Sequence, residues 1–181
     1  MRPAPSPQLK TAAENQLADY CWRAFDVNFQ QCLAQGESSI DFVLELASFR
    51  LGIEPVAADL AARAKDPQSI TLIEDAFRTL LECQHSSDAS LEADIRFDTT
   101  ILPASKSRFF LPFIPIVSAA LTVTAKHIED IRRSDGPCVD DHWAVVKAIR
   151  SGNARIARKQ SEALIENSLE MVRRCRGEDS W

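Results

Sequence analysis

The spacing of apolar residues constrains this chain most, because they recur every three or four positions along almost its whole length. That period places them on one side of an α-helix, whereas a half-buried strand needs strict alternation. Only 5 of the 181 residues are glycine, and no convincing strand pattern is present. We therefore predict an all-α protein, an antiparallel bundle of six to seven helices joined mostly by short connections.

Two helix boundaries carry strong start and stop signals. Asp66 before Pro67 is typical of a cap followed by the first residue of a helix. Gly152 is expected to end another helix, and Asn153 to cap the last one. The residues expected to face inward are Ile70, Ile73, Phe77, Leu80 and Leu81 in the first of these helices and Ile156, Leu164 and Met171 in the last.

Prolines are expected to interrupt two further helices. The helix that carries Val43 should bend or restart near Gly52 and Pro55. The longest apolar run, 109–125, contains two prolines and is shorter than a typical membrane-spanning helix. We predict that it forms a buried, kinked helix ending near Arg133, and that the protein does not enter a membrane.

Composition indicates a single domain in a reducing compartment. We predict a tail and connector helix over 1–39, the helical bundle over 40–177, and a short tail over 178–181. The net charge is −5 and basic residues are scattered, so the surface pattern of a nucleic-acid-binding protein is absent. No secretory signal opens the chain. The five cysteines are odd in number and far apart, which favours reduced thiols and a cytoplasmic location.

Four ionisable residues fall on the apolar sides of three predicted helices. Asp94 and Asp98 lie one turn apart on the helix that starts near Ser90, and Arg50 and His142 take corresponding positions on two others. Buried charges need partners. Their convergence favours a closed polar cavity inside the bundle that binds a ligand.

Each of these residues also has a purely structural interpretation. Arg50 could be paired with Glu54, which follows one turn later on the same helix. His142 could be an ordinary hydrogen-bonded core histidine. Asp94 and Asp98 could lie on an exposed side of their helix. The convergence of all four residues supports the ligand site more strongly than any one of them does.

The chemistry of these side chains suits two kinds of ligand. Arg50 can pair with a carboxylate through its planar guanidinium. Asp94, Asp98 and His142 can hold a divalent cation such as Zn, Ni or Mn, or form hydrogen bonds with ligand hydroxyls. No Ser-His-Asp pattern, glycine-rich phosphate loop or paired-cysteine motif is present, so we predict no enzyme activity.

Three segments, in matching order between about Ile40 and Met171, carry a family resemblance. Residues 49–64 place an Arg before a Glu-Pro and a run of alanines, 92–98 read Glu-Ala-Asp-Ile-Arg-Phe-Asp, and 141–154 begin Asp-His-Trp and end Gly-Asn-Ala. Together they resemble the FadR C-terminal (FCD) domain of GntR-type transcription regulators. A weaker likeness links Asp94-Ile95-Arg96-Phe97 to the galactonate-responsive branch.

The resemblance implies a six- or seven-helix bundle that binds a small organic acid, often beside a metal, and passes the signal to an attached winged helix. By position, Asp94 and His142 match two of the family's metal ligands, Asp98 stands where the family has its first histidine, and Leu164 replaces the last. We therefore expect an effector-sensing domain that forms a homodimer. The segment before it shows no recognition-helix pattern, so this chain by itself is not expected to bind DNA. The alternative is a structural or interaction protein with a degenerate, non-binding pocket.

Overall fold

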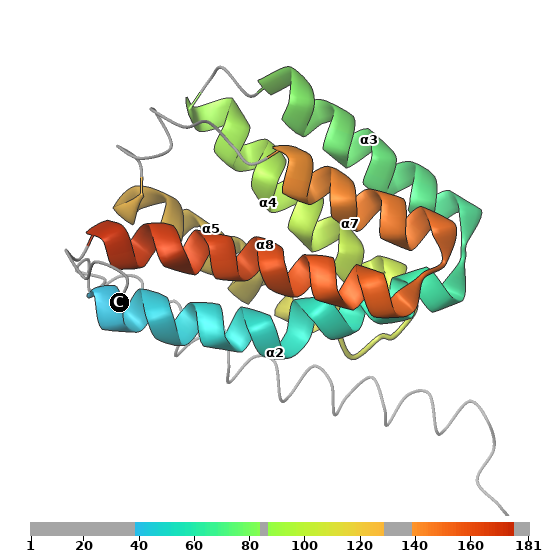
Figure 1. Cartoon of the computed structure of the whole chain (residues 1–181), viewed down its shortest axis with the longest axis horizontal. Coiled ribbons are helices and arrows are strands. Elements are labelled where there is room, and N and C mark those ends of the chain that lie inside the picture. The colour runs from blue at the N-terminus through green and yellow to red at the C-terminus, as the bar shows by residue number, and fades with distance from the viewer. Residues whose placement is uncertain (1–38, 84–86, 129–138, 176–181) are drawn as a thin grey trace, which may run out of the picture. The chain divides into compact units, whose positions relative to one another are not determined.

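The computed structural model (Figure 1) describes residues 39–83, 87–128 and 139–175, all within the unit Ser39–Trp181. This part of the chain forms six α-helices, one short 3-10 helix and no strand, which confirms the predicted all-α bundle. The predicted tail and connector helix over 1–39, apart from Ser39, and the predicted tail over 178–181 lie outside the described residues. The helices are α2 (Ile40–Ala64), α3 (Pro67–Cys83), α4 (Ser87–Ala104), α5 (Ile114–His127), α7 (Val139–Ser151) and α8 (Ala154–Cys175), with η1 (Leu111–Phe113) before α5.

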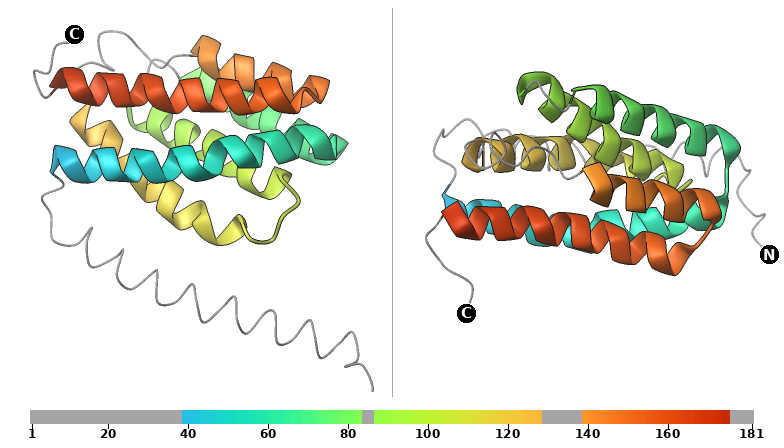
Figure 2. Two further views of the ribbon diagram at one scale, coloured as in Figure 1. Left: turned by 60° about the horizontal axis from the view of Figure 1, so that its bottom comes forward. Right: turned by 45° about the horizontal axis from the view of Figure 1, so that its top comes forward.

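The helices pack in neighbouring pairs around one core. The long helices α2 and α8 lie side by side, α3 packs on α4, and α7 packs on α8 (Figures 1 and 2). Helix α4 contacts α2, α3 and α5, so its side chains reach several neighbours. Phe97 of α4 is fully buried with Val117, Val145 and Ile149 from α5 and α7. This arrangement brings the inward sides of α2, α4 and α7 toward one interior.

Helix α2 is continuous through Gly52 and Pro55, so of the two predicted alternatives, a bend or a restart, the restart does not occur. Proline removes one backbone hydrogen bond from a helix. Pro55 is itself buried, and four alanines after it pack into the core, so tertiary contacts stabilise the helix on both sides of the proline.

The apolar run 109–125 does not form the single kinked helix that was predicted. Pro112 and Pro115 are the second residues of η1 and α5, in the first turn, where a missing backbone N–H costs little. The prolines therefore start two helices instead of kinking one. Helix α5 ends at His127, and the predicted end near Arg133 lies outside the described residues. None of the described helices is long and apolar enough to cross a membrane.

Two residues expected to face inward are exposed. Leu81 is 43% exposed and Ile156 is 39% exposed. Leu81 follows the fully buried Leu80 near the end of α3, so the helix rotation turns it away from the core. Ile156 lies in the first turn of α8 and lines an open hollow at the surface.

The predicted caps of α3 and α8 are confirmed. Asp66 Oδ2 accepts hydrogen bonds from the backbone N–H of Ser69 at 2.8 Å and from its hydroxyl at 2.7 Å. Asn153 Oδ1 accepts from the backbone N–H of Ile156, after Gly152 takes a φ of +73° that favours glycine. Asp66 also forms an ion pair with Lys106 Nζ at 2.7 Å, which ties the start of α3 to the segment after α4.

Asp66→Asn is expected to make folding less sensitive to acid. The hydrogen bonds from Lys106 and then from Ser69 lower the pKa of Asp66 from 3.8 to about 2. A depressed carboxyl pKa stabilises the fold above the unfolded pKa, and this contribution is lost as the pH falls toward the folded value. Urea unfolding should therefore show a stability difference between wild type and variant that shrinks between about pH 5 and about pH 2.

Lys106→Met provides a matched variant for this prediction, because it removes the ion pair but leaves both hydrogen bonds from Ser69. It should weaken the same pH dependence without abolishing it. A stability difference between wild type and Asp66→Asn that stays constant across the acid range would show that the pKa of Asp66 is not lowered.

Candidate ligand-binding site

Arg50 is the most buried charged residue in the described part of the bundle, with 2% of its surface exposed. Its Nε donates to Glu54 Oε1 at 2.7 Å and its Nη2 donates to Glu54 Oε2 at 3.1 Å. The same Nη2 donates to Asp98 Oδ2 at 2.7 Å, which joins α2 to α4. We call Arg50, Glu54 and Asp98 the buried ion network.

The electrostatics of this network keep Arg50 charged. Burial by itself would lower the pKa of Arg50, but the charges of Glu54 and Asp98 outweigh it and raise the pKa above its usual value. Charge-assisted hydrogen bonds of this kind are among the strongest in proteins. The guanidinium is therefore a permanent positive charge in the interior.

The pKa of Asp98 is raised, whereas an ordinary ion pair lowers the pKa of a carboxyl group. Burial raises its pKa first, the nearby charge of Glu54 adds to this, and Arg50 opposes both, so the pKa reaches about 7. The Asp98 carboxyl therefore takes up a proton more readily than an exposed aspartate does. Its Oδ2 accepts the hydrogen bond from Arg50.

A second polar pair joins α4 to α7. His142 Nε2 lies 2.9 Å from Asp94 Oδ1, and a carboxylate only accepts, so this nitrogen donates when the carboxylate is charged. Both side chains are largely buried, with 6% and 14% exposed. The ring of Phe97 meets the His142 ring edge to face at a centroid distance of 5.0 Å.

The structure thus brings all four predicted residues to the interior in two linked pairs. Asp98 and Asp94 do not lie on an exposed side of α4, so that structural interpretation is wrong. The pairing of Arg50 with Glu54 is present, and Asp98 adds to it. Sequence reasoning missed the contribution of Phe97, whose one signal is its place between the two aspartates on α4.

The predicted metal ligands fit a metal ion poorly. Asp98 Oδ2 accepts a hydrogen bond from Arg50, so a metal ion would have to displace the guanidinium to bind this oxygen. Leu164 is a buried apolar residue at the position of the family's last ligand histidine. Within the described ranges, no group of three or more His, Cys, Asp or Glu residues is arranged to hold a metal ion. Metal binding therefore stays a prediction without support from the donor geometry.

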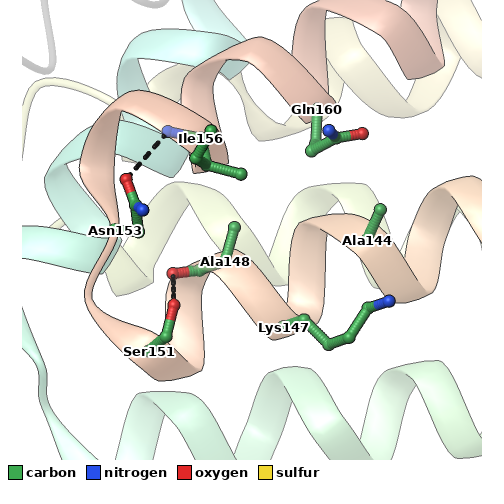
Figure 3. A pocket seen from close by; sticks show the side chains of 7 residues that line it. All are labelled: Ala144, Lys147, Ala148, Ser151, Asn153, Ile156 and Gln160. Carbon is green, nitrogen blue, oxygen red and sulfur yellow. Dashed lines mark hydrogen bonds between the residues drawn. The ribbon is translucent and has the colours of Figure 1, made fainter.

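An open hollow of about 240 Å³ lies elsewhere, between α7 and α8 (Figure 3). It is smaller than the usual range of ligand sites, about 300–1,000 Å³. Lys147 is the charged residue that lines the hollow, and none of the four predicted site residues lines it. The lining residues are Ala144, Lys147, Ala148, Ser151, Asn153, Ile156 and Gln160.

Residues 45–167 match the model of the FCD domain, which is more than half of the chain. The chain belongs to the FCD domain family. A solved structure described as Streptococcus agalactiae GntR is similar in fold, with a TM-score of 0.61 and 20% sequence identity. The match covers 75% of this chain and 62% of that structure. No curated protein matches the chain in sequence. The FCD match supports an effector-binding regulator domain, and the likeness to the GntR structure supports the fold.

Proposed function

We propose that this FCD domain senses a small organic acid, such as a sugar acid, for a GntR-type transcription regulator. One observation carries the proposal: α2, α4 and α7 bring Arg50, Asp98, Asp94 and His142 together inside the bundle. A guanidinium pairs well with a carboxylate, while imidazole and carboxyl groups form hydrogen bonds with hydroxyls. A hydroxylated acid would use both kinds of group.

The contacts suggest how such an acid would act on the fold. Arg50 of α2 forms an ion pair with Asp98 of α4 at 2.7 Å. The effector carboxylate would take the place of Asp98 on Arg50, and its hydroxyls would bind Asp94 and His142. Because this exchange changes the link between two helices, the acid would have different affinities for two arrangements of the bundle, as a sensor requires.

Thermal unfolding with a panel of sugar acids tests this proposal. A ligand that binds the folded chain raises Tm when its concentration greatly exceeds Kd. For an acid that does so, calorimetry should show about tenfold or greater loss of affinity in Asp94→Ala and His142→Ala, since each removes a hydrogen bond to a charged group. Asp75→Ala, in the more exposed pair with Arg78 on α3, serves as the control. Unchanged affinity in both site variants would remove these residues from the site.

The remaining features of the proposal follow from the family. We propose a regulatory rather than a catalytic role, a homodimeric state and a cytoplasmic location. The oligomeric state can be measured by light scattering on the purified chain with and without the acid.

A second function is favoured by the completeness of the polar contacts. No buried side-chain nitrogen or oxygen in the described part of the chain lacks a hydrogen-bond partner. An interior that satisfies itself in this way is also expected of a structural or interaction protein whose pocket no longer binds a ligand. In that case no acid of the panel would raise Tm, and the four residues would affect stability alone.

A further inference from the structure

The buried ion network surrounds one positive charge with several carboxylates. Arg50 contacts both oxygens of Glu54 and one oxygen of Asp98, and the charge of Asp94 also acts on it. Helical bundles commonly use carboxylates from facing helices to hold a cation in their core. Here the cation is a side chain of the protein itself.

The guanidinium occupies buried carboxylate oxygens that could otherwise bind a metal ion. Glu54 offers both oxygens to Arg50, and Asp98 offers Oδ2. The other candidate donors face each other, with His142 Nε2 against Asp94 Oδ1. A metal ion bound through these atoms would have to separate the pairs and lose their charge-assisted hydrogen bonds.

Repulsion between positive charges adds to this competition. An arginine side chain does not lose its proton in proteins, and Arg50 lies within hydrogen-bonding distance of Asp98. A divalent ion on Asp98 would therefore stand a few ångströms from a fixed positive charge in a medium that screens charges weakly.

We propose that the Arg50 guanidinium is the resident cation of this domain and takes the place of a divalent metal ion. The acidic side chains around it are neutralised by a group that the chain carries permanently. Folding of the domain is then independent of metal. This inference concerns the cation alone and does not depend on which acid the domain senses.

Metal content and thermal unfolding of the purified chain test the proposal directly. Mn²⁺ is the probe, because it prefers carboxylate oxygens and is bound less strongly by cysteine than Zn²⁺ is. The wild-type chain should carry no stoichiometric metal, and neither EDTA nor Mn²⁺ should change its Tm. One metal ion per chain, together with a lower Tm in EDTA, would overturn the proposal.

Removal of the guanidinium should create the metal site. Arg50→Met leaves Glu54, Asp98, Asp94 and His142 without the internal cation, so Mn²⁺ should raise the Tm of this variant by several degrees. Arg63→Met, which breaks a comparable i,i+4 pair with Asp59 at the surface, should show no response. If Arg50→Met folds but does not respond to Mn²⁺, Arg50 is not what excludes the metal. If it folds only with Mn²⁺ present, the proposal is supported, and if it does not fold at all, the wild-type measurements decide.

Discussion

Replacing Arg50 by methionine is expected to lower the free energy of unfolding by about 3–5 kcal/mol, because it leaves Glu54 and Asp98 buried without their positive partner. Methionine replaces the aliphatic part of the arginine side chain but leaves the volume of the guanidinium empty, so lost packing adds to the lost charge pairing. Urea unfolding in metal-free buffer measures the change. Arg63→Met is the control, since its side chain and that of Asp59 form the same kind of pair in a much more exposed place. Its effect should be far smaller.

A second step separates the unpaired charge from other causes. Adding Asp98→Asn and Glu54→Gln to Arg50→Met removes both buried negative charges while keeping the shapes of the side chains. The triple variant should regain part of the lost stability, because an uncompensated buried charge costs more than a neutral amide that finds a partner. A triple variant as unstable as the sum of its single changes would show that the charges are not the reason.

Phe97→Ala is expected to cost about 3–5 kcal/mol, the usual range for emptying a fully buried aromatic position. Phe97 is 0% exposed and contacts the rings of Phe77 and His142 at centroid distances of 6.4 and 5.0 Å. The expected loss of stability therefore has two causes, a cavity in the core and the removal of the ring that packs against His142. Phe109→Ala is the matched control, because Phe109 is 71% exposed and its loss should change stability by about 0.5 kcal/mol or less.

Variants of Phe97 also test its role in the candidate site. If Phe97 orients His142, Phe97→Leu should keep most of the stability, since it conserves much of the volume, but should weaken the binding of an acid that uses His142. Equal stability losses in the variants of Phe97 and Phe109 would contradict the packing described for α4.

The local pattern of the sequence was sufficient for the elements and for the inward residues of the site. Apolar spacing predicted the helices, and Asp66-Pro67 and Gly152-Asn153 predicted two of their boundaries, because caps and proline act within a few residues. The same spacing placed Arg50, Asp98, Asp94 and His142 toward the interior. These are properties of single helices, and a helix repeats with a fixed period.

The partners of those residues could not be predicted in the same way. Whether Arg50 holds Glu54 alone or also Asp98, 48 positions away, depends on how α2 and α4 are packed. The exposure of Leu81 and Ile156 likewise depends on which side of each helix the rest of the bundle covers. Sequence alone therefore determined an all-α FCD-like bundle with four inward ionisable residues. Only the tertiary structure decided that Asp94 pairs with His142 and that Asp98 pairs with Arg50. The physical reason is that a buried charge needs a partner, and helix packing decides which partner lies within reach.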